Sequence, residues 1–125
     1  MLKRLLACCG AGAMLLIALP AVARAQAAQA PAEQSITGTV VDVTCKFMKG
    51  VSGDAHRQCG VVCANAGLPL AILGDDGMLY VPLGEDAGKA STVNLKPHVD
   101  HKVTVKGKVF SSGGANGILI ASVSM

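Results

Sequence analysis

Two segments of this chain alternate in residue type with a period of two, and this pattern constrains the fold more than any other feature of the sequence. Residues 36–43 read ITGTVVDV, and residues 102–109 read KVTVKGKV. Successive side chains of a β-strand point to opposite faces, so this alternation predicts two half-buried strands. The second strand has a lysine-rich face, and Gly38 inside the first indicates a bulge or a sharp bend.

A helix and a hairpin are predicted between these two strands. The helix spans residues 54–66, with Asp54 as its N-cap and Gly67 at its C-terminal cap position. Two short apolar runs, 70–73 and 78–83, flank the turn residues GDDG, which predicts a pair of antiparallel strands. The first half of the domain is therefore predicted to contain a strand, a helix and a hairpin, in this order.

The second half of the domain is predicted to contain another helix and another hairpin. Residues 85–95 are interpreted as a short helix that Pro97 ends. The lysine-rich strand is followed by a loose turn at 111–117 and by a final strand at 118–123. The chain is thus expected to be mainly β, with five strands and two short helices.

This order of elements resembles the OB-fold, a small five-stranded Greek-key barrel with a helix between its third and fourth strands. The ending VTVKGKVF followed by GILIASV is also similar to the last hairpin of small OB-like domains in secreted bacterial proteins. The resemblance covers residues 35–125 and implies a single OB-like β-barrel domain. The helix at 54–66 would be an addition to the basic barrel, between strands one and two.

The first 25 residues are interpreted as a signal peptide. Lys3 and Arg4 precede an apolar run, and Ala23–Ala25 forms an A-x-A cleavage signal before Gln26. Residues 26–34 are small and polar and are expected to form a flexible linker. The mature protein is therefore expected to be periplasmic or secreted.

Two other interpretations of the leader are a membrane anchor and a lipoprotein signal at Cys8. The apolar run of about 15 residues is shorter than the ~20 that a bilayer-spanning helix needs, so no stable membrane insertion of the mature chain is expected. The main apolar run follows Cys8 instead of preceding it, which argues against a lipoprotein.

Charge and aromatic content argue against a nucleic-acid partner. Without residues 1–25 the chain has 8 lysines and arginines against 8 acidic residues. The aromatic residues are Phe47, Tyr80 and Phe110, too few to form stacking platforms for bases. The core must consequently be built from Val, Leu, Ile and Ala.

Cysteine and histidine form the pattern C-x10-H-x2-C-x3-C at Cys45, His56, Cys59 and Cys63. In a helix over residues 54–66, the last three of these share one face, which the loop after the first strand can bring close to Cys45. Three thiolates and an imidazole suit Zn²⁺. Thiolates with a thioether, for which Met48 is the candidate, suit Cu(I).

A disulfide is the alternative interpretation, since thiols pair in an oxidising compartment. Cys45 with Cys59 or Cys63 would close a loop of about 15 residues and stabilise the fold by roughly 3 kcal/mol. Three cysteines leave one thiol unpaired, which favours a metal site. Gly60, unfavourable in a helix by about 1 kcal/mol relative to alanine, indicates that another segment packs closely there.

No sequence motif indicates an enzyme. There is no nucleophile elbow and no phosphate-binding glycine loop, and a Cys–His pair lacks an evident third group to orient it. His98 and His101 flank Asp100 in what is expected to be a solvated turn.

The sequence therefore predicts an exported, non-enzymatic module that sequesters one copper or zinc ion or hands it to a partner protein. The alternative is a disulfide-stapled OB-like interaction domain that binds a ligand without metal.

Overall fold

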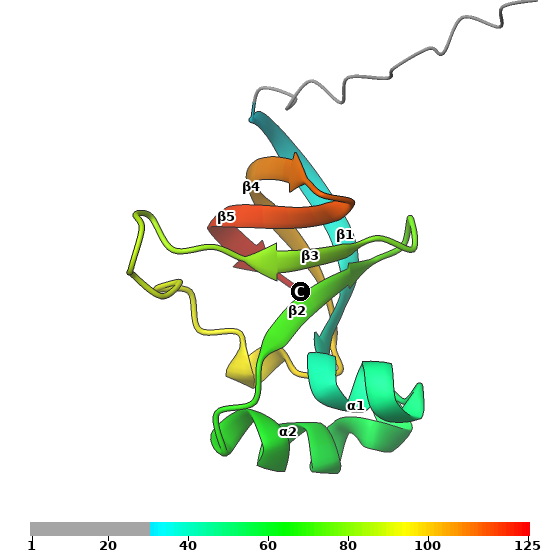
Figure 1. Cartoon of the computed structure of the whole chain (residues 1–125). Coiled ribbons are helices and arrows are strands. Elements are labelled where there is room, and N and C mark those ends of the chain that lie inside the picture. The colour runs from blue at the N-terminus through cyan, green and yellow to red at the C-terminus, as the bar shows by residue number, and fades with distance from the viewer. Residues whose placement is uncertain (1–30) are drawn as a thin grey trace, which may run out of the picture.

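The computed structural model describes residues 31–125, which form a closed five-stranded barrel with two helices at one end (Figure 1). The strands are β1 (Ala32–Asp42), β2 (Leu70–Gly74), β3 (Leu79–Pro82), β4 (Lys102–Ser112) and β5 (Ala115–Ser124). They close in the order β1-β2-β3-β5-β4. The predicted mainly β, OB-like barrel is confirmed. The predicted signal peptide, 1–25, lies outside the described residues.

The first strand closes the barrel by pairing with a different neighbour along each half. Residues 32–39 pair with β4, and residues 38–42 pair with β2, both antiparallel. Gly38 belongs to both pairings, opposite Gly74 and Val103, and a Cβ atom there would lie 2.3 Å from a backbone oxygen of β2. Closure thus depends on a residue without a side chain at this point.

The barrel core is aliphatic, as the scarcity of aromatic residues predicted. Tyr80 is the aromatic side chain buried in it, whereas Phe47 and Phe110 are exposed. The other core residues are Ile36, Val40, Ala64, Ile72, Leu95, Val99, Val103, Val105, Val109, Ile118 and Ile120. Ala64 comes from a helix, so the helical end is part of the same core.

Both helices lie between β1 and β2 and cover the lower end of the barrel in Figure 1. The predicted helix at 54–66 is present as a short 3-10 helix, η1 (Asp54–His56), that leads into α2 (Arg57–Asn65). Asp54 lies inside the 3-10 turn and pairs with the Arg57 side chain instead of capping the helix. No helix of residues 31–125 has the length and apolar character needed to cross a membrane.

The other helix, α1 (Val43–Lys49), was not predicted. Val43 and Thr44 are β-branched and extend the pattern of the first strand, so the sequence pattern alone favours strand. The Asp42 side chain accepts a hydrogen bond from the Cys45 backbone N–H at 2.9 Å and starts the helix instead. Gly50, with φ of 68°, ends it.

The predicted helix at 85–95 was wrong, because this segment is irregular up to a 3-10 turn, η2 (Lys96–His98). Gly88 has φ of 80°, outside the helical region. The Ser91 and Asn94 side chains accept hydrogen bonds from backbone N–H groups two residues ahead, which competes with helix formation.

Two boundaries also differ from those expected. Strand β1 begins at Ala32, inside the range 26–34 expected to be a flexible linker, because its first residues pair with β4. The turn expected at 111–117 is short, since Ser112 already faces Ala115 across the β4–β5 pair. Two glycines with positive φ make that turn.

Replacing Gly60 with alanine tests how α2 packs on the barrel. A Cβ atom at this position would lie 2.4 Å from Asp100 Oδ2 and 2.5 Å from Val99 Cγ1. We expect Gly60→Ala to lower the free energy of unfolding in urea by about 1–3 kcal/mol through overpacking, in spite of alanine's higher helix propensity. Gln58→Ala, an exposed change in the same helix, is the control and should leave stability unchanged. Equal stability of both variants would contradict the packing described.

Asp76 provides a pH-dependent contribution to stability at the β2–β3 turn. The Tyr80 hydroxyl donates to its Oδ2 at 2.6 Å and the Met78 N–H to its Oδ1 at 2.9 Å, and these hold the pKa of Asp76 below its ordinary value. The carboxylate therefore stabilises the fold above its unfolded-state pKa, and this stabilisation is lost as pH falls through the lower folded-state pKa. We expect Asp76→Asn to lower the melting temperature at pH 7 and to have little effect near pH 2. Glu85→Gln, which removes an exposed carboxylate that forms no ion pair within residues 31–125, should show no such pH-dependent difference.

Candidate metal centre

The three cysteines predicted as ligands come together where the two helices meet. Cys45 lies in α1, and Cys59 and Cys63 lie four residues apart in α2. Their Sγ atoms are all within 4.8 Å of one another, and all three are free thiols. We call Cys45, Cys59 and Cys63 the cysteine cluster.

The three thiols of the cysteine cluster differ in their exposure to solvent. Cys45 is buried, Cys63 is half-buried and Cys59 is exposed. One side of the cluster therefore faces the end of the barrel, and the other is accessible from outside. Such an arrangement allows an ion or a reagent to enter through Cys59 without opening the fold.

The beginning of α1 is held by the residue before the helix and by a residue that follows α2. The Asp42 carboxylate caps the helix, as described above, and the Val43 N–H donates to the Pro69 carbonyl oxygen at 3.0 Å. Pro69 lies in the segment that joins α2 to β2, so the beginning of α1 is tied to the chain that leaves α2. The Cys45 thiol is thereby kept next to the second helix.

The buried Asp100 positions the beginning of α2. Its Oδ1 accepts a hydrogen bond from the Gly53 N–H at 2.7 Å, and its Oδ2 accepts one from His56 Nδ1 at 2.8 Å. Its own backbone N–H donates to the Val40 carbonyl oxygen at 2.7 Å. Asp100 is 2% exposed, so the turn that was expected to be solvated instead contains a buried carboxylate that joins β1 to the helices.

His56, the fourth ligand predicted from the sequence, is not among the ligand atoms within 4.8 Å of one another. Its imidazole is oriented by Asp100, and its Nε2 atom is buried without a hydrogen-bond partner in the described part of the chain. Met48, the candidate thioether, is 78% exposed at the end of α1. The structure thus brings together the thiols and ties the imidazole to a carboxylate.

The environment of Cys63 favours its protonated form in the absence of a cation. Desolvation, contacts with the side chains of Asp42 and Cys59, and the charges of Cys45 and Cys59 raise the pKa of the Cys63 thiol to about 12. The thiol therefore keeps its proton at neutral pH. A metal ion that binds here has to displace it, because the thiolate is the ligand.

Two acidic residues of this region were missed as functional candidates. Asp42 precedes Cys45 by three positions, the spacing of an N-cap, and this signal was available in the sequence. Asp100 lies between two histidines, but its partner in the structure is His56, 44 positions away. No local pattern reports a contact over that distance.

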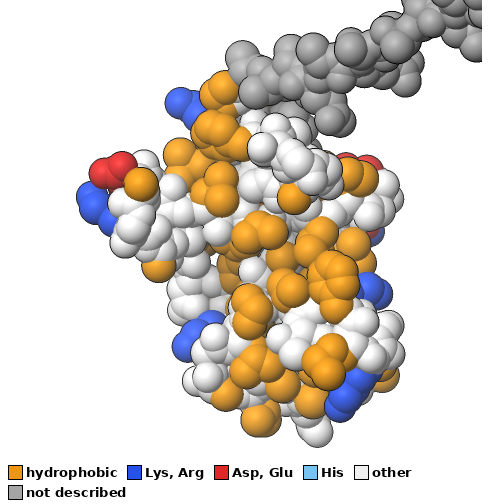
Figure 2. All heavy atoms as spheres, viewed as in Figure 1, with side chains coloured by type: hydrophobic (Ala, Val, Ile, Leu, Met, Phe, Trp, Pro, Cys, Tyr) orange, Lys and Arg blue, Asp and Glu red, His pale blue; other side chains and the backbone are white. Residues whose placement is uncertain are grey.

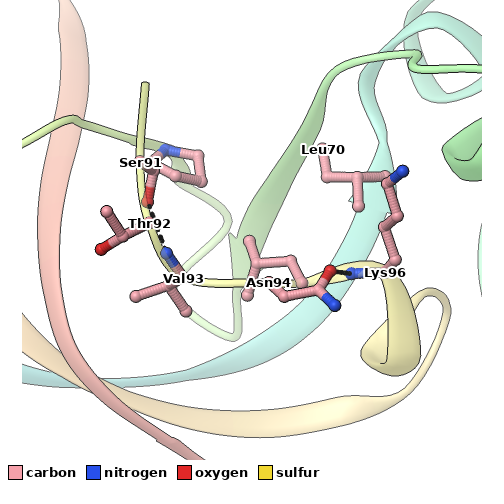
Figure 3. A pocket seen from close by; sticks show the side chains of 8 residues that line it. Leu70, Ser91, Thr92, Val93, Asn94 and Lys96 are labelled. Atoms are coloured by element: carbon pink, nitrogen blue, oxygen red, sulfur yellow. Dashed lines mark hydrogen bonds between the residues drawn. The ribbon is translucent and has the colours of Figure 1, made fainter. Parts of the chain in front are cut away.

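A separate surface pocket of about 330 Å³ lies between the start of β2 and the irregular segment before η2 (Figure 3). Its lining consists of Leu70, Pro82, Ser91, Thr92, Val93, Asn94, Leu95 and Lys96. The hydrogen bonds drawn there are the local turn contacts of Ser91 and Asn94. None of the cysteines lines this pocket, so it is distinct from the cysteine cluster.

No model of a protein family matches the chain, and neither curated proteins nor solved structures gave a match. Its function is therefore inferred from the chemistry of the cysteine cluster and of the residues around it.

Proposed function

We propose that this protein is an exported, non-enzymatic metal-binding module, a small secreted bacterial OB-like domain that holds one zinc or copper ion through Cys45, Cys59 and Cys63. The observation that carries the proposal is the convergence of three free thiols within 4.8 Å. Sulfurs that share one tetrahedral zinc ion at Zn–S distances of about 2.3 Å lie about 3.8 Å apart. The thiols thus need to move by only about 1 Å to share an ion.

Three converging sulfurs suit a metal site better than they suit a disulfide. Any disulfide within the cluster uses two sulfurs and leaves the third as an unpaired thiol. Cys59 and Cys63, one helical turn apart on α2, fit disulfide geometry poorly. A single soft cation engages all three sulfurs at once.

The surface beside the cluster supports transfer of the ion to a partner protein. Cys59 is exposed, and Val62, three positions further along α2, is 68% exposed. Phe47 and Met48 on α1 are also largely exposed. Figure 2 shows hydrophobic side chains on the end of the molecule that α1 and α2 form, as well as over the barrel above it. Exposed apolar side chains on the same two helices that carry the thiols suit a partner that approaches to exchange the ion by ligand substitution.

Metal content and thiol count test the proposal together. Protein purified from the exported fraction should carry about one equivalent of zinc or copper by elemental analysis. Alkylation after denaturation in chelator should label all three thiols, because metal protects them from oxidation. The disulfide-stapled interaction domain instead predicts one labelled thiol and negligible metal, and this result would overturn the proposal.

Serine variants test each ligand separately. We expect Cys45→Ser, Cys59→Ser and Cys63→Ser each to weaken zinc or copper binding by more than the roughly 10–100-fold lost when an outer-shell partner of a ligand is removed. Ser52→Ala, a change near the same helices, is the control for handling and folding. Retention of full affinity by all three serine variants would exclude the cysteine cluster as the binding site.

A further inference from the structure

The molecule contains two buried carboxylates near its helical end, and they differ in how their oxygens are satisfied. Asp100 is 2% exposed and both of its carboxylate oxygens accept hydrogen bonds, from Gly53 and His56. Asp42 is 1% exposed, but only its Oδ1 accepts a hydrogen bond, from the Cys45 N–H. Asp42 Oδ2 is buried and has no hydrogen-bond partner in the described part of the chain.

No basic side chain of residues 31–125 forms an ion pair with Asp42. The ion pairs found within residues 31–125 are His56–Asp100, Arg57–Asp54 and Lys102–Asp75. A buried charged oxygen without a hydrogen bond or a counter-charge is unfavourable, because it has lost its water and gained nothing in exchange. A cation bound at this point would compensate for that loss.

The capping of α1 does not by itself require an aspartate at position 42. An N-cap needs one side-chain oxygen, and serine or asparagine provides it as well as aspartate does. The negative charge and the second oxygen of Asp42 are thus surplus to the cap. Moreover, the Asp42 carboxylate binds the backbone of Cys45, one of the three cysteines, at 2.9 Å, so the carboxylate lies at the edge of the cysteine cluster. Its proximity is also one of the causes that raise the pKa of the Cys63 thiol.

We propose that Asp42 supplies the fourth ligand of the metal site, an oxygen beside the three sulfurs, and that the site therefore selects a divalent cation of the zinc class over Cu(I). This inference rests on the metal-binding function proposed above. Carboxylate oxygen is a regular zinc ligand, whereas Cu(I) prefers thiolate and thioether sulfur. A divalent ion also offsets more of the negative charge that a carboxylate and thiolates bring together.

The ligands have to close around the ion. No Asp42 oxygen is among the atoms that all lie within 4.8 Å of one another, so its carboxylate approaches the sulfurs when the cation binds. The Oδ2 atom is free to do this because the cap uses Oδ1. His56 Nε2 is the competing donor, since it is also buried and unpartnered. The geometry favours Asp42, because its carboxylate already binds the backbone of Cys45, whereas the His56 ring is held by Asp100.

The experiment compares Zn²⁺ and Cu(I) binding by the mature chain that begins at Gln26 and so lacks Cys8 and Cys9. This protein is freed of metal under reducing conditions and binds in competition with chromophoric chelators. We expect Asp42→Asn, which keeps the capping oxygen, to weaken Zn²⁺ binding by roughly 10–100-fold and to leave Cu(I) binding unchanged. Asp54→Asn, which removes one charge from the exposed start of the same helical region, should change neither affinity. The Co²⁺-loaded protein should show an altered visible spectrum only in Asp42→Asn.

Each other outcome overturns the inference. Zn²⁺ affinity that is equal in Asp42→Asn and Asp54→Asn, or an equal loss for Zn²⁺ and Cu(I), removes Asp42 as a selecting ligand while leaving the three-thiol site intact. A loss in His56→Ala without one in Asp42→Asn assigns the fourth position to the imidazole. Failure of the wild-type chain to bind either ion overturns the proposed function itself. Asp42→Ser, which also keeps a capping oxygen, repeats the test should the asparagine variant not fold.

Discussion

The helical end of this molecule depends on a single buried carboxylate, that of Asp100. It accepts hydrogen bonds from Gly53 and His56, while its backbone N–H binds β1 at Val40. Charge-assisted hydrogen bonds of this kind are among the stronger polar contacts in proteins, and their loss leaves an unpaired buried charge. The position of α2, and with it two of the three thiols, follows from this one side chain.

The two buried aspartates therefore have different roles at the same end of the barrel. Asp100 is fully satisfied by the protein and fixes the geometry of the helices. Asp42 is half satisfied and lies at the cysteine cluster, where the structure supplies no counter-charge among the residues it describes. The helices are thus fixed to the barrel by Asp100, while one oxygen of Asp42 beside the cysteine cluster has no partner among residues 31–125.

Much of the fold followed from the sequence because two of its strands alternate in residue type and its turns carry glycine. The exceptions were segments where local propensity and side-chain hydrogen bonding disagree. Val43 and Thr44 favour strand but lie in α1, since Asp42 caps a helix there, and the segment 85–95 forms turns at Ser91 and Asn94. The convergence of the thiols could be anticipated from their spacing along α2. The hydrogen bond between Asp100 and His56 could not, because only the tertiary fold brings these residues together.

The double pairing of β1 also sets the order in which the chain can fold. The first half of β1 pairs with β4. Within this pair, the hydroxyl groups of Thr37 and Thr104, 67 positions apart in the sequence, form a hydrogen bond. Contacts of such high sequence separation slow folding, since a long loop must close before they form. The barrel seam consequently cannot be made until nearly the whole chain is present. During synthesis, the first half of β1 therefore remains an unpaired strand edge until β4 has been made.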